Sequence, residues 1–200
     1  LLTTELTNQA NELSLNRKKA IKLVEEQTTL TLKQVGMPNA KLVLNQNSLT
    51  DLNKDGLDEI VLLFTANAGQ EPAPVHKVAS GGELSRLMLA IKALLAKHTS
   101  LPTLIFDEID TGISGETALK VGEVISSLGE NMQVLSITHL PQIAAKGNSH
   151  YFVYKNEENN KTTTGIRKLN SDERIHAIAE MLSGKNPGAS ALQNAKELLG

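Results

Sequence analysis

The stretch TLIFDE at residues 103–108 decides the fold of this 200-residue chain. Its first four residues are apolar or β-branched, and its last two, Asp107 and Glu108, are adjacent carboxylates. Short apolar runs of this kind are typical of buried parallel strands, and ligands of α/β sheets bind at the carboxyl ends of such strands. The stretch therefore predicts a parallel strand that delivers two acids to one edge of a sheet.

A second apolar strand is predicted at 133–138, and it ends at His139. We expect His139 to lie near the two acids, because parallel strands end at the same edge of a sheet. There an imidazole could hydrogen-bond a γ-phosphate or an attacking water. The turn that follows the acids contains Asp110, Gly112 and Ser114, and it is expected at the same edge.

The two acids suit nucleotide hydrolysis, which needs Mg²⁺, positioning and a group that orients water. Asp107 would bind Mg²⁺, a cation that takes one or two carboxylates and keeps several waters. Glu108 could then accept the proton of the attacking water. The simpler alternative is a strand that ends in two solvated acids.

The run SGGE at residues 80–83 supports the functional alternative. Ser80 and Glu83 fit a capping box, which needs no glycine between them. Gly81 and Gly82 cost helix stability in a first turn, but they let an anion approach bare N–H groups at the positive helix end. Capping and anion binding can coexist, with Ser80 donating its hydroxyl to a γ-phosphate.

The phosphate-binding pattern G-x-x-x-x-G-K-[ST] is absent from these 200 residues. The acids, the histidine and the SGGE run therefore indicate one lobe of an ATPase site, which we do not expect to hydrolyse ATP alone.

Residues 1–35 contain neither Gly nor Pro and predict one long helix. Its leucines follow an imperfect heptad, which favours a coiled-coil strand over an ordinary amphipathic surface helix. Four basic residues in this helix are interpreted as a solvated face rather than a DNA-phosphate contact; they are Arg17, Lys18, Lys19 and Lys22.

Strands at 41–44 and 59–64 flank a polar turn at 51–56, which matches the opening of a calcium loop. The position that needs a bidentate Glu is Leu62, so a simple turn is favoured over calcium binding. Residues 67–76 are expected to be a loop. The other predicted elements are helices at about 82–97, 115–128, 172–183 and 189–199, a short helix from Pro141, and a hairpin at about 150–155 and 163–169.

Composition excludes several functional classes. The chain has no cysteine, so disulfides and thiol nucleophiles are absent. The net charge of −2 gives no bulk positive field for nucleic acid or an anionic membrane. Hydrophobic residues make up 40% of the chain and only 2% of it is aromatic, so an aliphatic core is expected.

The order SGGE, acidic strand, glycine-containing turn and histidine resembles an ATP-binding-cassette ATPase: signature, Walker B, D-loop and switch histidine. Glu83 and the run DEID at 107–110 are similar to the chromosome-maintenance branch, whereas transporters usually carry Gln and Asp-Glu-Pro there. More narrowly, the segments 77–86, 106–115 and 137–145 and the closing helix resemble the RecN family of bacterial DNA repair ATPases. Ala79 departs from the usual superfamily Leu.

The resemblance implies an α/β fold, the C-terminal lobe of an ATPase head. Its sheet would be largely parallel, with flanking helices and an antiparallel edge. Residues 1–36 would end a coiled-coil arm, and 37–200 would form the lobe. Asp107 would bind Mg²⁺, Glu108 and His139 would act in catalysis, and seven residues would contact nucleotide: Ser80, Gly81, Gly82, Glu83, Asp110, Gly112 and Ser114.

The implied function is ATP-dependent head dimerisation and hydrolysis in double-strand-break repair and recombination, with ATP and Mg²⁺ as cofactors. The implied partners are an N-terminal Walker A lobe, a second head in a homodimer, and DNA, with no membrane. The implied location is the bacterial cytoplasm, at the nucleoid. A transporter nucleotide-binding domain and a non-catalytic calcium-binding module remain the alternatives.

Overall fold

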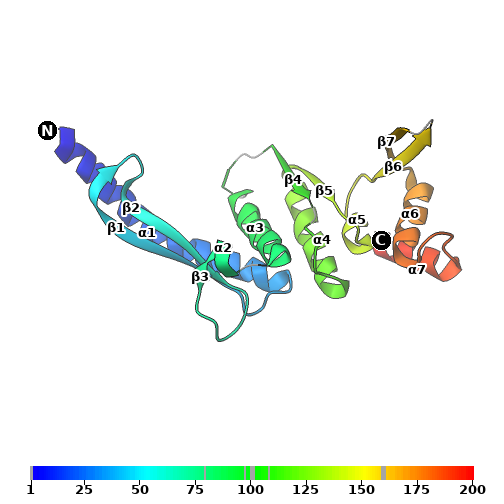
Figure 1. Cartoon of the computed structure of the whole chain (residues 1–200), viewed down its shortest axis with the longest axis horizontal. Coiled ribbons are helices and arrows are strands. Elements are labelled where there is room, and N and C mark those ends of the chain that lie inside the picture. The colour runs from blue at the N-terminus through cyan, green and yellow to red at the C-terminus, as the bar shows by residue number, and fades with distance from the viewer. Residues whose placement is uncertain (1, 79, 97, 100–101, 108, 159–160) are drawn as a thin grey trace. The chain divides into compact units, whose positions relative to one another are not determined.

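The computed structural model describes residues 2–78, 80–96, 98–99, 102–107, 109–158 and 161–200. Figure 1 shows the chain from the long N-terminal helix to the C-terminal helices. The chain divides into two compact units, Leu1–Leu101 and Pro102–Gly200, and each is described by itself.

Unit 1 consists of a long helix with an antiparallel hairpin along it. Helix α1 spans Leu2–Gln34, and strands β1 and β2 span Lys41–Asn53 and Gly56–Thr65. A two-residue β3, Ala73–Pro74, pairs with the end of β2. The hairpin packs on one side of α1, so the helix buries only part of its surface.

Two further helices complete unit 1. The short α2 spans Val75–Val78, and α3 spans Gly81–Ala96 and packs against α1. The core is aliphatic apart from one phenylalanine, as the composition predicts. It comprises Leu32, Met37, Ala40, Leu42, Phe64, Leu87 and Ala90.

The predicted heptad leucines lie outside this core. Ala10, Thr28 and Leu32 are the buried residues of α1. By contrast, five seam leucines are 40–72% exposed: Leu2, Leu6, Leu13, Leu23 and Leu30. Within the described part of unit 1, the helix therefore has one packed side and one apolar side that remains in contact with solvent.

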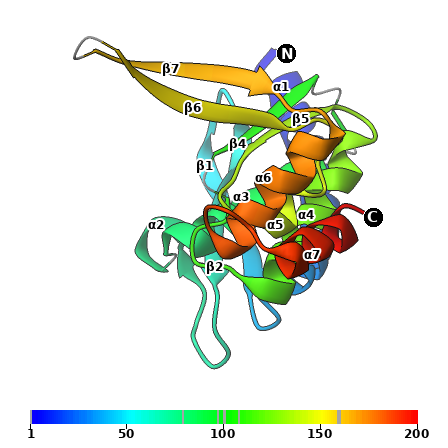
Figure 2. The same cartoon turned by 90° about the vertical axis from the view of Figure 1, so that its right-hand side faces the viewer.

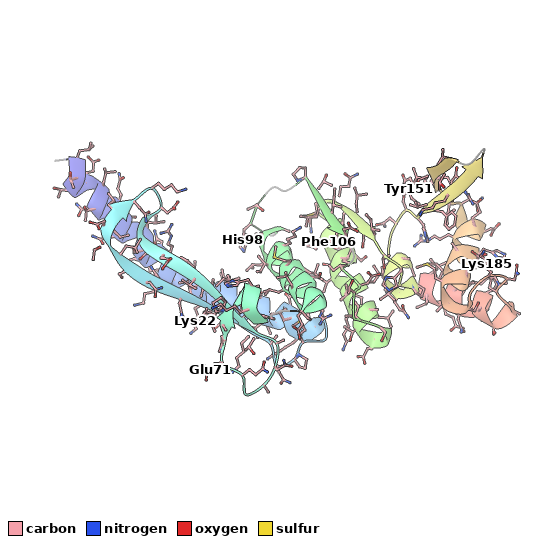
Figure 3. All side chains as sticks on the ribbon, in the orientation of Figure 1. Lys22, Glu71, His98, Phe106, Tyr151 and Lys185 are labelled. Atoms are coloured by element: carbon pink, nitrogen blue, oxygen red, sulfur yellow. The ribbon has the colours of Figure 1, made fainter. Side chains whose placement is uncertain are left out.

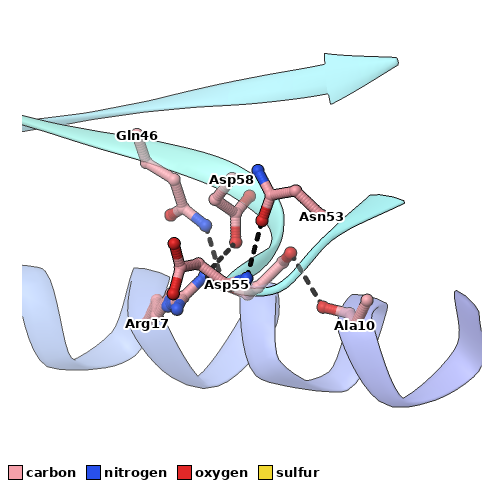
Figure 4. A network of polar contacts seen from close by, with 7 residues as sticks. Ala10, Arg17, Gln46, Asn53, Asp55 and Asp58 are labelled. Atoms are coloured by element: carbon pink, nitrogen blue, oxygen red, sulfur yellow. Dashed lines mark hydrogen bonds and ion pairs between the residues drawn. The ribbon is translucent and has the colours of Figure 1, made fainter. Parts of the chain in front are cut away.

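A polar clasp, centred on Arg17 and Asp58, joins α1 to the hairpin (Figure 4). The Arg17 guanidinium donates to the carbonyl oxygen of Asp55 at 2.8 Å and lies 3.4 Å from the buried carboxylate of Asp58. The amide of Gln46 donates to the carbonyl oxygen of Ser14 at 3.0 Å. Arg17 therefore belongs to the structure of the hairpin, in contrast to the solvated face that the sequence predicted for it.

The clasp makes the stability of the folded chain depend on pH. Hydrogen bonding to Ser14, opposed by burial and reinforced by Gln46 and Arg17, holds the pKa of Asp58 below its usual value. A depressed carboxyl pKa contributes stability above the unfolded-state value, about pH 4, and this contribution is lost as pH falls through the folded-state value. Arg17→Met should therefore lower the melting temperature by several degrees at pH 7 and weaken its fall between pH 4 and pH 2.

Thermal melts across this pH range measure both effects, and Lys19→Met, which removes an exposed charge from the same helix, serves as the control. Equal melting curves for the two variants would contradict the structural role of Arg17.

Unit 2 begins with the predicted parallel strands. Strand β4 spans Thr103–Asp107 and pairs in parallel with β5, Gln133–Ile137. The crossover helix α4, Gly115–Gly129, buries Ala118, Val121 and Ile125. Phe106 on β4 (Figure 3) and Leu104 are also buried. The α/β class and the parallel strand pair are confirmed.

The other face of this parallel pair is apolar and exposed. Ile105 lies opposite Leu135 and is 58% exposed, and Ile137, opposite Asp107, is 60% exposed. Parallel sheets are almost always covered on both faces. Within the described part of unit 2, this face lacks such a cover.

The rest of unit 2 is a hairpin and three helices (Figure 2). The helices are α5, Pro141–Ala144, α6, Ser171–Ser183, and α7, Ala189–Leu199. Strands β6, Tyr151–Glu158, and β7, Lys161–Lys168, form an antiparallel sheet of their own. A small core joins the helices through Ala145, Ile178, Ala179, Ala191 and Ala195.

Two expectations need correction. The loop predicted at 67–76 contains β3 and the start of α2. The strand predicted at 41–44 continues to Asn53, because its polar residues pair with β2. None of the described helices is long and apolar enough to cross a membrane.

Candidate functional site

The acidic strand and the histidine end at the same edge of unit 2. Asp107 is the last residue of β4 and pairs in register with Ile137, the last residue of β5. His139 follows Ile137 by two residues, so the structure brings Asp107 and His139 to one edge. Asp107 is exposed there. Glu108 lies outside the described residues, and its role stays a prediction.

Asp110 is buried beneath this edge and is bonded to the segment after β5. Its Oδ2 accepts a hydrogen bond from the backbone N–H of His139 at 2.8 Å and from the hydroxyl of Thr138 at 2.5 Å. The Nδ1 atom of His139 lies 3.0 Å from the same oxygen. Asp110 is 1% exposed, whereas the His139 side chain is 72% exposed. The carboxylate therefore anchors a ring that projects into solvent.

The electrostatics of Asp110 favour its ionised form. Burial opposes ionisation, but hydrogen bonds from Thr138 and from the backbone of His139 outweigh it and hold the pKa of Asp110 below its usual value. A buried carboxylate with this many donors stays charged near neutral pH. Asp110 is thus a fixed negative charge next to His139.

The loop between the acids and α4 has a conformation that requires glycine. Gly112 and Gly115 have φ values of +75° and +54°, in the left-handed region. Ser114 is the N-cap residue of α4, but its side chain makes no capping hydrogen bond. Its hydroxyl therefore does not cap the helix, and a ligand-binding role requires a hydroxyl that is not used in this way.

The SGGE run lies in unit 1 at the start of α3, and the predicted capping box is present. The carboxylate of Glu83 accepts from the N–H of Ser80 at 2.8 Å, and the hydroxyl oxygen of Ser80 accepts from the N–H of Glu83 at 3.4 Å. Accepting leaves the hydroxyl proton of Ser80 available to donate. The capping role and the predicted anion role therefore remain compatible.

Local packing gives no reason for glycine at position 81. A Cβ atom built there would meet no atom within 4 Å, so a larger side chain would fit within this chain. Close approach of a ligand to the backbone therefore stays the predicted reason for glycine at position 81. The SGGE run belongs to unit 1 and the acidic edge to unit 2.

Sequence reasoning missed Thr138. Its hydroxyl accepts from the N–H of Leu140 at 3.0 Å and donates to Asp110, so it closes the turn that presents His139. A threonine directly before a strand-ending histidine was the available signal. Its partner, however, lies 28 residues earlier in the chain.

The calcium alternative gains no support. The segment at 51–56 is mostly strand, and only Lys54 and Asp55 form its turn. The side chain of Asn53 accepts from the N–H of Asp55 at 2.7 Å, and the Asp55 carbonyl binds Arg17. Among the described residues, no group of three or more acids or histidines could hold a metal ion.

No family model matches this chain. Among curated proteins, it is 42% identical over 193 residues to DNA repair protein RecN of Haemophilus influenzae and 40% identical over 198 residues to RecN of Deinococcus radiodurans. These matches cover 95% and 99% of this chain but 34% and 35% of the relatives. The chain thus spans about a third of the length of the curated relatives it matches.

Solved structures show the same fold. The Smc head domain of Pyrococcus furiosus, with an extended coiled coil and bound to the C-terminal domain of ScpA, matches with a TM-score of 0.61 at 16% identity, over 90% of this chain and 43% of that one. The Smc head domain of Pyrococcus yayanosii matches with a TM-score of 0.60 at 18% identity, over 86% and 32%.

A third chain, from a study of ATP-driven dimerization and DNA-stimulated activation of SMC ATPases, matches with a TM-score of 0.55 at 16% identity, over 88% of this chain and 99% of that one. Together, the comparisons establish that this chain has an SMC head fold, is RecN-like over nearly its whole length, and corresponds to the C-terminal part of that DNA repair protein.

Proposed function

We propose that this chain supplies part of an ATP-hydrolysing site that is completed by other polypeptide. The observation that carries the proposal is the meeting of Asp107 and His139 at one sheet edge. Glu108 follows Asp107 directly in the sequence. Asp107 would hold Mg²⁺, Glu108 would take the proton of the attacking water, and His139 would contact the γ-phosphate or that water.

The single carboxylate of Asp107 at this edge suits Mg²⁺ that is bound together with phosphate groups, rather than a metal ion held by protein ligands alone. Mg²⁺ keeps several waters and is usually bound by one or two carboxylates together with phosphate oxygens. One exposed carboxylate at a strand end matches that demand. Bound there with ATP, the ion would neutralise charge that develops on the phosphates.

The missing phosphate loop would come from a Walker A lobe. The exposed face of β4 and β5, with Ile105, Leu135 and Ile137, is the surface that we assign to that lobe. Such a cover would satisfy the rule that parallel sheets are buried on both faces. About two thirds of the length of the relatives lies outside this chain, which leaves ample polypeptide for this lobe.

The SGGE run would serve a nucleotide held by a second head. Ser80 would donate its hydroxyl to the γ-phosphate, and Gly81 and Gly82 would let the phosphate approach the start of α3. Glu83 would hold the turn in shape through its bond to the N–H of Ser80. In the loop after the acids, Gly112 and Ser114 would contact the same shared nucleotide. ATP would then join two heads, and hydrolysis would release them.

We assign the exposed leucine seam of α1 to a coiled-coil arm, so that residues 1–36 form the arm and 37–200 the lobe. Leu2, Leu6 and Leu23 are exposed in unit 1. An antiparallel helix of the same longer protein would cover them.

The biological setting proposed is repair of DNA double-strand breaks at the bacterial nucleoid. The name of the relatives, DNA repair protein RecN, at about 40% identity, supports the repair setting, and the resemblance to the RecN family implies double-strand breaks and the nucleoid. Neither the transporter nor the calcium alternative is favoured by an observation on this chain.

The proposal predicts that this chain alone binds ATP poorly, because no lysine-bearing loop holds the β- and γ-phosphates. Calorimetric titration with MgATP should give no saturable heat below about 1 mM nucleotide. A matched titration of the longer protein that contains the loop should saturate. Micromolar binding by the chain alone would contradict the division of the site between lobes.

A further inference from the structure

One carboxylate oxygen organises the residues that present His139. The Oδ2 atom of Asp110 accepts hydrogen bonds from the N–H of His139 and the hydroxyl of Thr138. The Nδ1 atom of His139 lies 3.0 Å from the same oxygen. Three polar groups from the end of β5 therefore converge on one buried atom of the preceding loop.

This arrangement determines which ring nitrogen of His139 carries the proton. If Nδ1 were unprotonated, its partial negative charge would lie 3.0 Å from the negatively charged Oδ2, and the two would repel each other. A proton on Nδ1 makes the same contact attractive. In the neutral ring, the second nitrogen, Nε2, must then carry the lone pair.

The exposure of the two side chains gives them different roles. Asp110 is 1% exposed and is occupied by donors of its own chain, so it offers little surface to a ligand. His139 is 72% exposed, and its Nε2 atom is the ring nitrogen not held against Asp110.

We propose that Asp110 is a positioning residue that holds His139 in the Nδ1–H form and makes Nε2 the atom that meets the substrate. The inference rests on the proposed function, which identifies that substrate as a nucleoside triphosphate with its attacking water. Neutral Nε2 accepts a hydrogen bond from the water, and a second proton lets Nε2 donate to the γ-phosphate. Both protonation states place the same atom in the same direction.

Nuclear magnetic resonance of this chain tests the proton position without any nucleotide. In ¹⁵N-labelled protein at pH 8 to 9, the long-range correlation spectrum of His139 should show a protonated Nδ1 and an unprotonated Nε2. The chain has five histidines, so His139→Gln identifies the signal by its disappearance. A protonated Nε2 in the unmutated chain would overturn the proposal.

Asp110→Asn provides the matched variant. Asparagine keeps the size of the side chain and can place an oxygen at the Oδ2 position to accept from Thr138 and the N–H of His139, but it removes the negative charge that favours a proton on Nδ1. The two ring-nitrogen resonances should therefore move toward each other or exchange positions. Thr138→Val removes a hydroxyl and keeps the carboxylate, so it should leave the Nδ1–H form in place. An unchanged His139 spectrum in Asp110→Asn would overturn the proposal, and the backbone amide spectrum monitors folding of both variants.

Activity of the longer protein gives a second readout. Asp110→Asn should lower kcat for ATP hydrolysis and leave KM nearly unchanged, because Asp110 acts on orientation rather than binding. A longer protein that hydrolyses no ATP at all would contradict the proposed function, yet the Nδ1–H result would stand. The spectrum therefore tests the proton position on His139, and the rate tests the proposed ATPase function.

Discussion

Glu108→Gln in the longer protein should slow ATP hydrolysis by about 10²–10⁴-fold, the usual contribution of a positioned general base. Glutamine keeps the size of the side chain and its ability to hydrogen-bond water, but it cannot accept the proton. ATP binding and ATP-dependent dimerisation should persist, because the group acts on the attacking water. Steady-state hydrolysis and size-exclusion chromatography with ATP measure the two effects.

Glu123 supplies the matched control, since it is an exposed glutamate on α4 in the same unit. Glu123→Gln makes the same chemical change away from the acidic edge and should leave the rate unchanged. Near-normal hydrolysis by Glu108→Gln would remove Glu108 from the proposed role. Loss of nucleotide binding in that variant would point to a structural role instead.

Ser80→Arg should abolish dimerisation that depends on ATP, weakening it by about 10²-fold or more, which corresponds to at least ~2.7 kcal/mol. The start of α3 would receive the γ-phosphate of a nucleotide held by the partner head. A long arginine side chain would fill that position, where Gly81 leaves open space. Analytical ultracentrifugation of the longer protein with and without ATP measures the dimerisation constant.

Ser80→Ala separates loss of the hydroxyl from filling of the anion position. It removes the hydroxyl that caps α3, at a cost of about 1 kcal/mol in helix stability, but it leaves the anion position empty. Its dimerisation should therefore weaken far less than that of Ser80→Arg. Equal losses in both variants would mean that loss of the hydroxyl, rather than filling of the anion position, weakens dimerisation, and an unchanged constant in Ser80→Arg would refute the anion role.

The parallel strands and the edge at which they end could be predicted from sequence because the signal is local. Residues 103–107 and 133–137 are short apolar runs, and the polar residues that follow them must lie where the strands end. The same reasoning places α4, whose apolar residues recur at helical spacing after Gly115. Local composition determines these elements almost completely.

The long hairpin could not be predicted because its second half is polar. Seven of the residues 45–53 are polar, and four of these are Asn or Asp, which are depleted in strands. They form β1 because β2 supplies an antiparallel partner for residues 45–48 and for Asn53, with an irregular register between them, and most of this part of the strand is exposed to water. Tertiary pairing, rather than local propensity, decides this element.

The roles of Arg17 and Asp110 depend on residues distant in sequence. Arg17 stands among lysines that suggest a solvated face, yet its partner Asp58 is 41 residues away. Asp110 lies in a motif that suggests contact with nucleotide, but the groups that bind it come from the turn after β5. A pattern of residue types identifies the motif but not the direction of each side chain.

Mixing two inactive variants of the longer protein tests the central claim, a site shared between two heads, most directly. Ser80→Arg and Glu108→Gln should each hydrolyse little ATP alone. In a mixed dimer, one site combines an intact Glu108 with an intact Ser80 from the partner. An equal mixture should therefore recover measurable hydrolysis, at most roughly a quarter of the unmutated rate. Random pairing would make about half of the dimers mixed, each with one intact site of two, and the weaker pairing of Ser80→Arg lowers that share. No recovery on mixing, with mixed dimers demonstrably formed, would contradict the account.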